Sequence, residues 1–163
     1  ISGSKVINLE GLRREIIMEN TGALILWYIA AYVIVTAIGV LHTIFNITVL
    51  HMKSMKESEG MGEGYEKTKP WHVLYNIIVF PVFAYIYFSG LSSVTWEAAA
   101  FTSFVWGTIT IILDVFGWVL IKHPWSLTFK QFYVEYQPWI TLIYAAIYSS
   151  PFIAFGIMKV SLF

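Results

Sequence analysis

Four long apolar segments constrain this chain more than any other feature. They are expected at about 22–50, 71–91, 96–121 and 139–163. Each has at least the roughly 20 residues needed to cross a hydrocarbon core about 30 Å thick. Only 12% of the residues are charged, whereas soluble domains carry about 25%, so a water-soluble fold could not cover this apolar surface. The sequence therefore predicts a multi-pass integral membrane protein: an all-α, four-helix transmembrane bundle in a single domain over 1–163, surrounded by the lipid bilayer.

Two further segments are predicted to form short interfacial helices. Residues 5–20 place apolar side chains at helical spacing beside Arg13 and Arg14. Between the third and fourth spans, Thr128 and Gln131 match a capping box, which predicts the start of a second short helix. We expect the aromatic side chains of that helix to lie in the membrane interface: Phe129, Phe132, Tyr133 and Tyr136.

The loops predict the orientation of the chain. Residues 52–69 hold four lysines and four glutamates around a glycine-rich stretch, which is typical of a flexible, solvated loop. The first and third loops together carry six basic residues, against four on the opposite side. The positive-inside rule therefore favours both termini outside.

The composition excludes several kinds of chemistry. The chain has no cysteine, which rules out disulfides, thiolate metal sites and iron–sulfur clusters. Its net charge is zero, so it lacks the basic surface of a nucleic-acid partner. Neither a nucleotide motif nor a His-x3-His or Glu-x2-His pattern is present, and only one histidine lies deep in a span. Metal and haem are therefore not expected, and the cofactor is left unidentified.

Asp114 is the strongest candidate for a functional side chain. It is the only aspartate, and it lies inside the third apolar segment, where a charge costs roughly 2.5–3.5 kcal/mol to insert. Gly107, Thr110, Gly117 and Trp118 share its helical face, and Thr110 or the Trp118 N–H is expected to hydrogen-bond the carboxylate. The functional interpretation is a proton-carrying or cation-binding carboxylate. The structural one is a neutral or paired acid that holds helices together.

His42 is the predicted partner of Asp114. It lies on the first span with Asn46 one turn further on, and His42-x8-His51 repeats the spacing of Asp114-x8-His123. If that repeat is genuine, His42 and Asp114 lie at one depth and can contact each other. The alternative is a histidine that only packs. On the second span, Asn76 is deep enough to join the same polar site.

Four other ionisable residues are predicted near the membrane surface. His51, His72 and His123 fall near one interface, and Glu135 lies at the edge of the fourth span. His72 follows Lys69-Pro70-Trp71, which favours a histidine at headgroup level. These residues are the only candidates for an interfacial enzyme, and no catalytic motif accompanies them.

The leading functional hypothesis is a protein that binds or translocates a small solute or lipophilic ligand at an intramembrane polar site. The site would contain Asp114, His42, Asn46, Asn76 and Trp118. Tyrosines within the spans could line such a pocket. Two alternatives stay open: a non-catalytic subunit of a larger membrane complex, and a membrane-embedded enzyme that acts on lipids at the interface. Four spans are few to enclose a pathway, so a homodimer is also considered.

Overall fold

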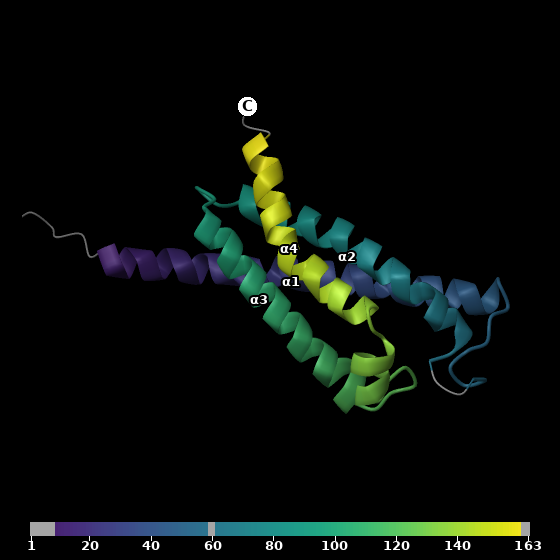
Figure 1. Cartoon of the computed structure of the whole chain (residues 1–163). Helices are drawn as coiled ribbons and strands as arrows, with labels where there is room; N and C mark the ends of the chain where they lie inside the picture. Colours follow the sequence, from purple (N-terminus) through teal and green to yellow (C-terminus); the bar gives the residue numbers. More distant parts are fainter. Residues whose placement is uncertain (1–8, 59–60, 161–163) are drawn as a thin grey trace, which may run out of the picture.

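The protein is described here by a computed structural model that covers residues 9–58 and 61–160. The elements drawn in Figure 1 are helices joined by loops, and no strand occurs in the described part of the chain. In chain order the elements are α1 (Leu9–Thr48), α2 (Glu63–Ser89), α3 (Trp96–Asp114), the π-helical segments η1 (Val115–Leu120) and η2 (Gln131–Glu135), and α4 (Trp139–Val160).

The four predicted spans are confirmed as helices long and apolar enough to cross a membrane. They comprise Asn20–Thr48, Glu63–Ser89, Trp96–Leu120 and Trp139–Val160. The chain is thus an all-α, multi-pass membrane protein. Helix α2 packs against both α1 and α4, and α4 also packs against α3. Direct contact between α1 and α3 is sparse, and in Figure 1 the ribbon of α3 runs obliquely to α1.

The second span begins earlier than the sequence predicted. Helix α2 starts at Glu63, so the second half of the expected loop is helical and Pro70 lies inside the helix. The cause is a buried set of hydrogen bonds: Asn46 Nδ2 donates to the Gly64 carbonyl at 3.0 Å and to Thr68 Oγ1 at 3.1 Å. These bonds hold the first turns of α2 against α1, and a solvated loop over this stretch is therefore wrong.

The two predicted interfacial helices differ in outcome. Residues from Leu9 onward belong to α1 without a break, so the first is not a separate helix, and residues 5–8 lie outside the described part. The second is present as a short helix that begins at the predicted reciprocal cap: Thr128 N donates to Gln131 Oε1 at 2.8 Å, and Gln131 N donates to Thr128 Oγ1 at 3.2 Å. The aromatic side chains of this segment differ in burial: Phe129 is exposed, whereas Phe132 and Tyr136 are buried.

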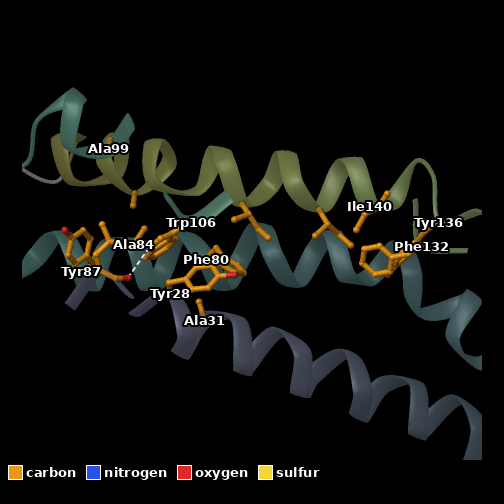
Figure 2. Packing of buried hydrophobic residues seen from close by; sticks show 14 of the residues in the cluster. Tyr28, Ala31, Phe80, Ala84, Tyr87, Ala99, Trp106, Phe132, Tyr136 and Ile140 are labelled. Atoms are coloured by element: carbon orange, nitrogen blue, oxygen red, sulfur yellow. Dashed lines mark hydrogen bonds between the residues drawn. The ribbon is translucent and has the colours of Figure 1, made fainter. Parts of the chain in front are cut away.

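Aromatic rings fill the centre of the bundle, as Figure 2 shows. Tyr28 of α1, Phe80 of α2 and Trp106 of α3 are fully buried and contact one another, with ring centroids 5.8–6.0 Å apart. Phe132 and Tyr136 cluster with Ile140 at the other end of the same core. Large rings of this kind provide much of the packing area in a bundle that has no water to exclude.

Candidate functional site

A cavity of about 100 Å³ lies inside the bundle, toward the end that carries the first and third loops. Asp114, Trp118 and Asn76 from the predicted polar site line it, and so does His72. Met55 of the first loop and Trp125 and Leu127 of the third line its loop side. The structure thus brings three of the five predicted site residues to one cavity.

Hydroxyl groups hold the Asp114 carboxylate. The side chain is 6% exposed, and Tyr32 Oη donates to its Oδ1 at 2.8 Å. The Tyr144 hydroxyl of α4 also interacts with it, and Tyr144 in turn lies 3.2 Å from the Tyr133 hydroxyl. Within the described residues no lysine, arginine or histidine forms an ion pair with Asp114. The carboxylate is therefore oriented by neutral groups from two helices.

The position of Asp114 follows from a register shared by α1 and α3, which run in parallel. Trp106 Nε1 donates to the Leu24 carbonyl at 3.1 Å, and the Tyr28 and Thr110 hydroxyls lie 2.9 Å apart. The Tyr32–Asp114 bond continues this ladder. Each of these hydrogen bonds lies four residues after the previous one on both helices, because positions i and i+4 share one helical face.

The chain leaves α-helical geometry directly after Asp114. Residues Val115–Leu120 form a π-helical segment, a distortion that is rare in proteins and often found at functional sites. Trp118 projects from this segment, and its Nε1 donates to Tyr32 Oη at 3.3 Å. The expected hydrogen bonds from Thr110 or Trp118 to Asp114 are therefore wrong. Both residues pair with tyrosines of α1 instead.

His72 is placed differently from its prediction. It points into the bundle, and its Nδ1 forms a short hydrogen bond with the Tyr136 hydroxyl. Its Nε2 is buried and has no hydrogen-bond partner in the described part of the chain. That nitrogen faces Gly39, where an added Cβ would lie 2.6 Å away. In either neutral tautomer one polar atom of the ring stays unsatisfied.

Tyr136 keeps its proton at physiological pH. Burial raises its pKa well above the usual value of 10, and the nearby Tyr65 acts in the same direction. The Tyr136 side chain is therefore a neutral hydroxyl where it meets His72. Because η2 is held by its capping box, this hydroxyl is presented to the cavity from a fixed position.

His42 and Asn46 do not belong to the cavity. His42 Nδ1 lies 2.7 Å from the Tyr75 hydroxyl, and its ring packs edge-on against Trp71. The α1 residue level with Asp114 is Tyr32, ten positions before His42, which corresponds to about 15 Å along a helix. The predicted equal depth and direct contact of His42 and Asp114 are therefore wrong. Asn46 serves the α1–α2 contact described above.

The remaining interfacial candidates lie apart from one another. His123 Nε2 is 2.8 Å from the Gly117 carbonyl, and its Nδ1 accepts from Trp125 N at 3.2 Å. Glu135 forms an exposed ion pair with Lys130 at 3.1 Å, and His51 is exposed with a positive φ of 55°. In the described ranges no three His, Asp or Glu side chains are grouped as metal ligands would be. The structure does not assemble these residues into a joint site.

The sequence predicted that tyrosines within the spans could line a pocket, but it did not predict which of them contact Asp114 and His72. Tyr32 and Tyr144 contact the carboxylate, and Tyr65 and Tyr136 line the cavity around His72. One signal was available: Tyr28 and Tyr32 have the same four-residue spacing as Thr110 and Asp114. Two hydroxyls at the spacing of two polar residues on a parallel helix predict a matched pair of hydrogen bonds.

A second hollow, of about 320 Å³, lies beside the cavity. Its lining is mostly apolar side chains of the Leu113–Ile121 stretch, with His123 at one end. Tyr32 and Trp118 line both spaces, so this hydrogen-bonded pair stands between them. Phe116 and Ile121 on the outer side are more than half exposed, which suits contact with lipid.

Comparisons with protein-family models, with curated proteins and with solved structures found no match to this chain.

Proposed function

We propose that this protein binds a small solute or lipophilic ligand in the cavity beside Asp114 and takes part in moving it across or out of the membrane. One observation carries the proposal: a carboxylate without a basic partner and a histidine with one unpaired nitrogen line the same cavity. Asp114 forms no ion pair, and His72 Nε2 no hydrogen bond, with any residue in the described part of the chain.

Such groups are costly if they serve packing alone. Burying a polar atom without a partner costs roughly 2–7 kcal/mol, depending on the reference state. A hydrophobic side chain at position 72 would avoid that cost in a helix bundle surrounded by lipid, and one at position 114 would avoid the cost of a carboxyl group inside the membrane. Polar groups that line a cavity are instead what a bound ligand requires for orientation. The arrangement therefore favours ligand binding over a purely structural role.

The Tyr32 and Trp118 side chains form a wall between the cavity and the hollow beside it. Movement of this wall would open a route for the ligand. A single long hydrogen bond of 3.3 Å joins the two side chains, and α1 and α3 have few other contacts at this level. Rotation of the Trp118 side chain would connect the cavity to the hollow at the lipid-facing surface. Lipophilic ligands that partition into the bilayer would reach Asp114 by this path.

Access to the cavity can be tested with single cysteines, because the chain has none of its own. Thr36 lines the cavity, whereas Val33 on the same helix is 57% exposed on the outer surface. In vesicles, we expect Thr36→Cys to react with the small neutral reagent 2-hydroxyethyl methanethiosulfonate. Val33→Cys should stay unreactive, because a thiol in contact with lipid does not ionise readily.

Equal protection of both cysteines would show that no solute enters the cavity, and the proposal would then be wrong. Replacing Trp118 by Ala in the Thr36→Cys background tests the route. We expect labelling to become faster when the wall is removed. The interfacial-enzyme alternative has no supporting contact within the described residues, since His123, His51 and Glu135 are each engaged or placed separately.

A further inference from the structure

We infer that the ligand of this cavity is a small organic cation of the alkylammonium class, with Asp114 as its counter-ion. This inference rests on the proposed function and specifies its ligand. Three features of the cavity support it: its charge, its aromatic lining and its size.

The cavity has one acidic group and no basic side chain among its lining residues. Asp114 is the one formally charged side chain among its lining residues. The titratable groups that interact electrostatically with Asp114 from the surrounding elements are all neutral tyrosines: Tyr28 and Tyr32 of α1, Tyr65 of α2, Tyr133 of η2, Tyr136 directly after it, and Tyr144 of α4. His72 of α2 lines the same space, but its Nδ1 is hydrogen-bonded to the Tyr136 hydroxyl and not to Asp114. The ionised form of Asp114 therefore needs a cation from outside the protein to balance its charge.

The lining of the cavity selects an organic cation over a metal ion. Six aromatic side chains surround the space: Tyr32, Tyr65, Trp118, Trp125, Phe132 and Tyr136. Aromatic faces attract alkylammonium groups, and a cage of rings with one carboxylate is a common recognition mode for them. A metal ion such as Ca²⁺ needs six to eight oxygen ligands, and the described residues offer no group of three acidic or histidine side chains.

The size of the cavity limits the cation. A cavity of roughly 150 Å³ holds benzene, and a water molecule occupies about 30 Å³ in the liquid. The cavity of about 100 Å³ in this protein is smaller than the one that holds benzene, so tetramethylammonium, which is about as bulky as benzene, sets the upper limit of the headgroup that it accepts. A larger ligand would have to place its remaining atoms past the Tyr32–Trp118 wall, in the hollow next to the lipid.

The same carboxylate can neutralise either a proton or an organic cation, but not both at once. When a permanently charged cation binds, a proton held at Asp114 must leave, so the net charge of this buried site stays constant. Binding therefore weakens as the pH falls, because protons compete for Asp114. A quaternary ammonium probe does not titrate itself, so any pH dependence belongs to the protein.

The experiment is a calorimetric titration of the purified protein in an uncharged detergent with tetramethylammonium. We expect saturable binding that weakens at lower pH and falls at least tenfold in Asp114→Asn. The uncharged tert-butyl alcohol, which has a similar shape, should not compete. Trp125→Leu removes one ring of the cage and should weaken binding severalfold, whereas Trp96→Leu, on the exposed surface, should leave it unchanged.

Equal affinity of Asp114→Asn and the unchanged protein would overturn the inference, as would tert-butyl alcohol that binds as well as the cation. If Asp114→Asn fails to fold, the affinity of Trp125→Leu for tetramethylammonium and the competition by tert-butyl alcohol still test the inference. If tetramethylammonium does not bind but Thr36→Cys is labelled, the inference of a cationic ligand is wrong and the proposed function stands. If neither tetramethylammonium binding nor Thr36→Cys labelling is observed, the inference and the proposed function are both wrong.

Discussion

Single residues decide how the polar groups of this membrane protein are used. Gly39 is one of them, since the absence of a side chain there leaves room for the His72 ring. Glycine in a helix interior costs up to about 1 kcal/mol relative to alanine, so its presence here has to serve packing. The ring fills the space, and its Nδ1 reaches Tyr136 directly after η2.

Replacing Gly39 by Ala should therefore destabilise the protein. The new Cβ would lie 2.6 Å from His72 Nε2, and displacement of the ring should lower the free energy of unfolding by about 1–3 kcal/mol. Gly156→Ala is the matched control, because nothing lies within 4 Å of its Cβ position. That variant should be unchanged or more stable by up to about 1 kcal/mol. Unfolding in detergent measures both, and equal effects would contradict the proposed His72 placement.

At the scale of elements, the seam between α1 and α3 depends on polar contacts. Other helix pairs in this bundle pack over long stretches, whereas α1 and α3 meet at three hydrogen bonds spaced by one helical turn. In lipid, helix association gains little from the hydrophobic effect, so hydrogen bonds and close packing determine such a seam. Asp114 terminates this ladder, and the cavity begins directly beyond it.

Thr110→Val tests the seam. Valine has nearly the same shape but no hydroxyl, so Tyr28 Oη loses the partner at 2.9 Å. Leaving a buried hydroxyl unpaired should lower the free energy of unfolding by about 1–3 kcal/mol. Thr108→Val on the same helix is the control, because Thr108 is only half-buried and has no hydrogen-bond partner among the residues that the structure describes. A Thr110→Val variant as stable as this control would show that the ladder contributes little.

At the scale of the whole molecule, four antiparallel crossings place the first and third loops at one end of the bundle. The cavity opens toward the same end, where Met55, Trp125 and Leu127 line it. The third loop also carries η2, which supplies Tyr136. The two loops thus act together on one site although they lie about 70 residues apart in the chain.

Single-cysteine labelling in vesicles tests this topology. Ser58→Cys in the first loop and Ser126→Cys in the third should react from the same side, and Ser92→Cys in the second loop from the other. The six basic residues of the first and third loops predict that their side is the cytoplasmic one. Reactivity of Ser58→Cys and Ser126→Cys from opposite sides would contradict the four-span arrangement.

The sequence by itself determined the number of spans and the membrane class, and it singled out Asp114 as the candidate functional residue. These follow from local quantities: the length of an apolar run, the cost of a charge in lipid and the spacing of residues on one helix. The capping box at Thr128 and Gln131 is local for the same reason. None of these properties depends on which helices become neighbours.

Only the tertiary structure decided the partners of those residues. The register of α1 against α3 pairs Tyr32 with Asp114 and leaves His42 three helical turns away. The early start of α2 and the packing against Gly39 turn His72 into the bundle. The depth of a side chain in a bundle, and the neighbour that it faces, depend on shifts of a few ångströms between helices. Close packing between the helices sets those shifts, and the pattern along any one helix does not.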